Sequence, residues 1–237
     1  MLAIAGGKGG CGKTTTAVGI ARTLARRGYD PLVLDADCDM PDVHHVAGVG
    51  RTGEDDRSGV ARVADGAPVR RATSTSPTLP DVRLLTAGTG QETERALRTM
   101  NEWHGPVLVD CPAGVAPDAT RPLRHAETTL VVSTDEPQCL EDAAKTRRVA
   151  EKLGSPSIGV LLRRRGGDLD NESAIATVPS VEEPFRSQQV EAGWHAVVDE
   201  LDASGWLSNT GEWLFDGCAQ LTTDYTPNMP LDSKYKN

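Results

Sequence analysis

The chain has 237 residues, of which 38% are hydrophobic and 4% aromatic, and its formal net charge is −9. This length fits one α/β domain with a full core. No stretch approaches the roughly 18 consecutive apolar residues of a membrane-spanning helix. The acidic balance disfavours bulk attraction to DNA or anionic lipid and would suit a high-salt cytoplasm. Because the chain starts on a strand with no signal peptide, we expect a cytoplasmic protein.

A phosphate-binding loop follows the first predicted strand, residues 2–5. Residues 6–15 read GGKGGCGKTT, and residues 7–14 match the pattern G-x-x-x-x-G-K-[ST]. Glycines let successive N–H groups turn into one concavity, which holds phosphate oxygens together with the start of the helix predicted over 14–27. Lys13 brings a charge to the β- and γ-phosphates, and the Thr14 hydroxyl ligates Mg²⁺. The expected nucleotide contacts in this loop are Gly7, Lys8, Gly9, Gly10, Cys11, Gly12, Lys13, Thr14 and Thr15.

Two further apolar runs end in carboxylates. Residues 31–35 read PLVLD and lead to Asp37, and residues 106–110 read PVLVD. Continuous apolar runs are typical of parallel strands buried on both faces, and ligands bind beyond the carboxyl ends of such strands. Phosphoryl transfer needs metal and water held in place, so we expect Asp110 to hold the Mg²⁺ water shell. The run after Asp110, CPAG, allows the Gly114 N–H to approach the γ-phosphate.

The remaining elements follow from hydrophobic periodicity and from glycine and proline punctuation. We expect a polar loop over 50–59, strands over 82–85, 128–133, 157–162 and 174–179, and helices over 40–49, 60–64, 92–102, 138–153 and 188–201. Residues 1–203 form the predicted domain. Residues 204–237 form an extension, either packed on the domain or partly irregular, with no basic amphipathic membrane helix.

Lys8 is an addition that an ordinary phosphate loop does not need. The run K-G-G-x-G-K-[ST]-T, with D-x-D at 35–37 and D-x-P-A-G at 110–114, resembles the deviant Walker A proteins of the MinD/ParA family. This resemblance implies a three-layer P-loop NTPase with a mostly parallel central sheet flanked by helices. It also implies that Lys8 crosses an ATP-bound dimer interface to the partner's nucleotide. By the same resemblance, Asp37 orients or activates the attacking water and Asp35 contributes to the Mg²⁺ shell through water, which makes Lys8, Lys13 and Asp37 the catalytic set.

One position departs from the family pattern. The family has Asn then Arg after the strand at 157–162, where this chain has Arg163 and Arg164. Arg163 could stack on the base or bind a carbonyl through its planar fork, but it cannot donate and accept as an amide does. Pro179 is expected near the base. Residues 163–165 could alternatively form a small basic patch for DNA or lipid, or a solvated turn.

The resemblance implies an ATP- and Mg²⁺-dependent dimerisation switch with slow turnover, stimulated by a protein activator or cargo adaptor. Its task would be positioning of a division site, of DNA or of a polar or motility assembly, with membrane or polar location reached through a partner. One alternative is a regulatory nucleotide-binding protein with little turnover. Another is an Mrp-like metal-cluster carrier, which the absence of a C-x-x-C pair disfavours. Five cysteines, an odd number, indicate reduced thiols.

Overall fold

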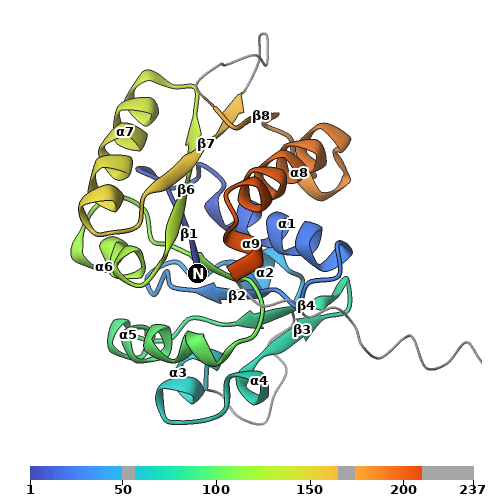
Figure 1. Cartoon of the computed structure of the whole chain (residues 1–237), viewed down its shortest axis with the longest axis vertical. Coiled ribbons are helices and arrows are strands. Elements are labelled where there is room, and N and C mark those ends of the chain that lie inside the picture. The colour runs from blue at the N-terminus through green and yellow to red at the C-terminus, as the bar shows by residue number, and fades with distance from the viewer. Residues whose placement is uncertain (50–56, 165–173, 210–237) are drawn as a thin grey trace, which may run out of the picture.

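The computed structural model describes residues 1–49, 57–164 and 174–209. An eight-stranded sheet in the order β3-β4-β2-β5-β1-β6-β7-β8 crosses the centre of the molecule (Figure 1). All neighbouring pairs are parallel except β3 and β4, so the predicted mostly parallel architecture is confirmed. The strands are β1 (Leu2–Ala5), β2 (Leu32–Asp35), β3 (Ser74–Ser76), β4 (Leu79–Leu85), β5 (Val107–Asp110), β6 (Thr128–Thr134), β7 (Ser157–Arg164) and β8 (Ala176–Pro179).

Helices cover both faces of the sheet, which gives three layers (Figure 1). They are α1 (Lys13–Arg26), α2 (Val43–Val46), α3 (Gly59–Ala64), α4 (Val69–Ala72), α5 (Gly90–Thr99), α6 (Pro117–Thr120), α7 (Pro137–Lys152), α8 (Gln188–Ala203) and α9 (Trp206–Asn209). Three 3₁₀ turns are η1 (Met100–Glu102), η2 (Pro122–Arg124) and η3 (Pro184–Arg186). Among the described residues, no helix is long and apolar enough to cross a bilayer.

Strand alternation divides the hydrophobic core in two. Leu2 and Ile4 of β1 pack with α1 and α8 on one face, whereas Ala3 and Ala5 pack on the other face with α3, α5 and α7. Each central strand is apolar on both sides, which explains its continuous hydrophobic run. Trp206, in α9, is buried in the same core as α1 and α8.

The predicted helices and strands lie within a few residues of observed elements, but the cap of α5 and several short elements went unpredicted, namely β3, α4, α6, α9, η2 and η3. The short polar strand β3 carries no apolar signal. The start of α5 is a capping box, in which the Thr89 side chain accepts from the Glu92 N–H and Glu92 accepts from the Thr89 N–H. The pattern T-x-x-E at 89–92 is the sequence signature of that cap. Predictions for residues 50–56, for Arg165 and for residues 210–237 of the extension lie outside the described residues.

Helices α1 and α8 meet at a glycine. A Cβ on Gly19 would lie 2.2 Å from Cε2 of Trp194, so the indole of α8 rests directly on the α1 backbone. Trp194 is 2% exposed, and its ring centroid lies 5.3 Å from that of Phe185. A helix interior normally favours alanine over glycine, and here the tryptophan reverses that preference.

We predict that Gly19→Ala destabilises the protein by about 1–3 kcal/mol, because the added methyl group overpacks the indole. Chemical denaturation measures the change. The matched control is the same substitution in a Trp194→Leu background, where the smaller side chain leaves room and the cost should largely disappear. An equal cost in both backgrounds would show that the indole contact is not its cause.

Candidate functional site

Three adjacent strands bring the predicted motifs to one edge of the sheet. Strands β2, β5 and β1 are neighbours, with Asp35 beside Asp110 and Ile4 beside Asp110 in register. The Ala36 N–H donates to the Asp110 carbonyl at 3.0 Å, and the Gly114 N–H donates to the Gly6 carbonyl at 3.0 Å. The segments after Asp35 and Asp110 are therefore joined by backbone hydrogen bonds to each other and to the phosphate loop.

The phosphate loop wraps around the start of α1. Gly12 caps this helix with φ of 98°, a left-handed conformation that favours glycine. Lys13 is only 7% exposed, and its charge acts on Asp110. The Asp110 carboxyl also has a side-chain hydrogen bond with Thr14. The loop, its buried lysine and the carboxylate at the end of β5 thus form one cluster.

Lys8 differs from Lys13 in exposure and in its partner. Its side chain is 53% exposed, and Nζ lies 3.3 Å from Oε2 of Glu136, just before α7. The hydrogen bond to Glu136 raises the pKa of Lys8, with the nearby Cys139 and the charge of Glu136 adding to it. Lys8 is therefore charged and held at the rim of the loop. Glu136 was not predicted as a partner, because only the fold brings α7 to the loop.

The carboxylates of Asp35 and Asp110 are buried side by side. Desolvation, and then repulsion by Asp110, raises the pKa of Asp35 to about 8, against the donated N–H groups of Val43 and Asp37. Desolvation raises the pKa of Asp110 to about 7, although the Thr14 hydrogen bond and Lys13 lower it. A cation at this edge would relieve both carboxylates.

The donor set fits a Mg²⁺–phosphate complex. Asp110 is 2% exposed, and its Oδ1 has no hydrogen-bond partner. Mg²⁺ is commonly held by one or two carboxylates together with substrate phosphates, so a complete protein cage is unnecessary. Among the described residues, no group of three or more His, Cys, Asp or Glu side chains could hold a metal alone. In Asp35 both oxygens already accept N–H groups, from Asp37 at 3.1 Å and Val43 at 3.2 Å.

Asp37 lies next to this cluster, two residues after Asp35. Its Oδ1 accepts from the Met40 N–H at 3.0 Å, so the carboxylate also stabilises the turn after β2. Asp39 and Asp42 are exposed.

The described cysteines are free: Cys11, Cys38, Cys111 and Cys139. Burial raises the pKa of the thiols of Cys11, Cys38 and Cys111.

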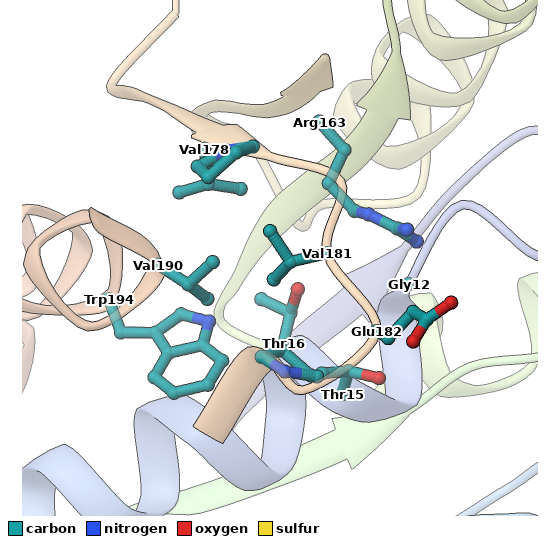
Figure 2. A pocket seen from close by; sticks show the side chains of 11 residues that line it. Gly12, Thr15, Thr16, Arg163, Val178, Val181, Glu182, Val190 and Trp194 are labelled. Atoms are coloured by element: carbon teal, nitrogen blue, oxygen red, sulfur yellow. The ribbon is translucent and has the colours of Figure 1, made fainter. Parts of the chain in front are cut away.

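A pocket of about 160 Å³ adjoins the phosphate loop, between the ends of β7 and β8 and helix α8 (Figure 2). Arg163 and Pro179, both expected near the base, line it. Sequence reasoning did not place the remaining lining residues at the site, because they come from separate elements: Thr16, Val178, Val181, Glu182, Pro184, Val190 and Trp194. Arg164 points elsewhere, with Nε 3.5 Å from Oδ2 of Asp135, so these two arginines do not form a joint basic surface.

This fold and this loop define a P-loop nucleotide-binding protein. A family model described as the CobQ/CobB/MinD/ParA nucleotide binding domain matches residues 2–188. The chain therefore belongs to that family, and the resemblance to MinD/ParA proteins is confirmed.

Relatives agree with this assignment. An uncharacterised ATP-binding protein of Methanocaldococcus jannaschii is 30% identical over 193 residues, covering 76% of this chain and 69% of the relative. A putative septum site-determining protein MinD of Tupiella akineta is 28% identical over 193 residues, covering 77% of this chain and 62% of the relative. The chain thus spans less than two thirds of the Tupiella protein.

Solved structures share the fold. The cell division ATPase MinD of Pyrococcus furiosus matches with a TM-score of 0.69 and 25% identity, covering 86% of this chain and 98% of that one. The septum site-determining protein MinD of Pyrococcus horikoshii, complexed with Mg-ADP, matches with a TM-score of 0.73 and 21% identity, covering 89% and 98%. The second likeness shows the fold alone.

We predict that the stability of the free protein falls as Asp35 ionises. Its pKa in the folded state, about 8, exceeds the ordinary 3.8, so folding favours the protonated form. The stabilisation is complete below about pH 4 and is lost as the pH rises through about 8. Without nucleotide or Mg²⁺, the melting temperature of Asp35→Asn relative to wild type should therefore rise between about pH 5 and about pH 9.

The matched control is Asp39→Asn, an exposed carboxylate of the same segment. It shows what an Asp→Asn change in this segment does to the melting temperature over the same pH range. If the Asp35→Asn difference from wild type does not rise between about pH 5 and about pH 9 beyond that of the control, the burial argument is wrong.

Proposed function

We propose that this chain is a Mg²⁺-dependent ATPase whose ATP-bound form dimerises face to face, with Lys8 of each subunit reaching the nucleotide of the other. Hydrolysis is slow and separates the subunits. A protein activator or cargo adaptor stimulates it, and the switch serves spatial positioning in division or DNA partition, in line with the septum site-determining relatives. Fold alone supports many tasks, so the site carries the argument.

The observation that carries the proposal is that the two lysines of one loop have different surroundings, one buried and one exposed. Lys13 is buried against Asp110 and serves the loop of its own subunit. Lys8 is about half exposed and paired with Glu136, just before α7, so its charge is not buried within that loop. Solvent screens an exposed ion pair such as this one, so Lys8 can leave Glu136 for a phosphate at little cost.

Exposed apolar side chains at the same edge support a subunit contact. Among the described residues, the exposed large hydrophobic side chains are Met40, Val115, Leu140 and Val181. Each belongs to a segment that follows the carboxyl end of a strand: β2, β5, β6 and β8 respectively. A rim of apolar groups around a polar site is typical of an interaction surface.

The residues have separate tasks in the proposed reaction. The loop N–H groups and Lys13 bind the phosphates, Thr14 and Asp110 hold the metal, and Asp35 keeps the segment after β2 in place. Bound Mg²⁺ would neutralise charge on the β- and γ-phosphates. Asp37 positions the attacking water. The Gly114 N–H, now bonded to the Gly6 carbonyl, would have to leave it to reach a γ-phosphate. Positioning without a strong general base predicts slow turnover.

We predict different losses for the two lysines. Lys13→Ala should abolish ATP binding, because Lys13 is the one buried Lys or Arg side chain in the part of the chain that the structure describes. Lys8→Ala should keep most ATP binding but form no ATP-dependent dimer. Titration calorimetry measures binding, and size exclusion with light scattering measures mass.

The control is Lys152→Ala, which removes an exposed lysine at the end of α7, far along the chain from the loop. It should bind ATP and dimerise as wild type does. A Lys8→Ala protein that dimerises with ATP like this control would contradict the proposal.

A further inference from the structure

The pocket beside the phosphate loop has two unlike ends. Gly12, Thr15 and Thr16 place it next to the start of α1, where a bound nucleotide would continue beyond its phosphates. One wall is apolar and consists of the buried Val178, Val190 and Trp194, the more exposed Val181, and two prolines, Pro179 and Pro184. Such a wall suits the flat face of a nucleobase. The edge of the base must then meet whatever polar groups stand at the other end.

Arg163 is fixed at that other end. Its Nη1 donates to the Gly10 carbonyl at 3.2 Å, and its Nη2 donates to the Ser180 hydroxyl at 2.8 Å. A Cβ on Gly12 would lie 2.7 Å from Nη1, so the guanidinium rests on the loop backbone. These two bonds use two of the five N–H donors of the group. The planar fork therefore stands at the pocket rim, oriented before any ligand arrives.

Glu182 stands at the same end. Figure 2 shows the side chains of Glu182 and Arg163 beside Gly12, away from Trp194. An ionised carboxylate only accepts hydrogen bonds, whereas a guanidinium only donates them. The pocket therefore offers one donor-only group and one acceptor-only group. Neither of these two groups is an amide, which both donates and accepts.

The two purines differ in what they present to such groups. Guanine carries two neighbouring acceptors, O6 and N7, which an arginine fork binds in a bidentate manner. Its N1–H and N2 amino groups are neighbouring donors that a carboxylate can accept. Adenine carries the N7 acceptor beside the N6 amino donor, and an Asn or Gln amide can bind both. A group that only donates hydrogen bonds can bind N7 but not the N6 amino group. Adenine N6 can still donate to Glu182.

We propose that this pocket accepts guanine at least as well as adenine, so that the chain binds GTP as well as ATP, and that Arg163 is the residue that sets this base preference. The inference rests on the proposed function insofar as a nucleotide must occupy the phosphate loop. It concerns the base alone.

Titration calorimetry of the full chain with Mg²⁺ and slowly hydrolysed analogues of ATP and GTP tests it. We expect the Kd for the GTP analogue to equal that for the ATP analogue or to be lower, by up to about tenfold, since one bidentate pair contributes discrimination of about that size. A GTP analogue that binds clearly more weakly than the ATP analogue overturns the inference and leaves the proposed function standing. If neither analogue binds, the proposed function fails as well.

Two variants at Arg163 test the fork itself. Arg163→Asn supplies an amide and should shift the ratio of affinities toward ATP by about tenfold. Arg163→Lys keeps the charge without the planar fork and should also lower GTP affinity relative to ATP. Equal losses for both nucleotides would mean that Arg163 binds phosphate, which overturns its role in base selection. Circular dichroism checks folding, and the wild-type ratio decides the main point even if a variant does not fold.

Discussion

The whole site depends on three neighbouring parallel strands that end at the same edge of the sheet. The register of β1, β2 and β5 puts the phosphate loop, Asp35 and Asp110 together, although they lie far apart along the chain. The cost is two carboxylates buried side by side, each with a raised pKa. Lys13 and the Thr14 hydroxyl offset part of that cost at Asp110. The remaining imbalance suits a cation, which is why this edge fits a metal-bound nucleotide better than an empty state.

Much of this arrangement is predictable from the sequence, for physical reasons. The apolar runs that end in Asp35 and Asp110 must be buried, parallel strands align their carboxyl ends, and the glycine-rich loop needs a strand before it and a helix after it. The capping box that starts α5 was also visible, as Thr89 and Glu92, but it was not recognised. The strand β3 is short and polar, so its place depends on β4 and not on its own pattern.

Contacts between segments that lie far apart along the chain could not be predicted from the sequence. The partner of Lys8 is Glu136, 128 residues away, and Arg163 bonds to the Gly10 carbonyl, 153 residues away. Residue type told us that Arg163 is not an amide, but only the fold shows where its fork points. The same holds for Trp194, which lies within the helix predicted over 188–201, while its contact with Gly19 depends on how α8 crosses α1.

The central claim is that Lys8 acts on the nucleotide of another subunit, and a complementation assay tests it most directly. Lys8→Ala and Asp37→Ala proteins should each be inactive as ATPases, the first because it forms no ATP-dependent dimer by itself and the second because its dimer lacks Asp37 at both sites. In a mixture, the mixed dimer has one complete site: the Lys8→Ala subunit keeps its own Asp37 and receives Lys8 from its partner. The account predicts that mixing the two restores ATP hydrolysis. If the wild type hydrolyses ATP and the mixture stays as inactive as its components, Lys8 does not act across subunits and the account is contradicted.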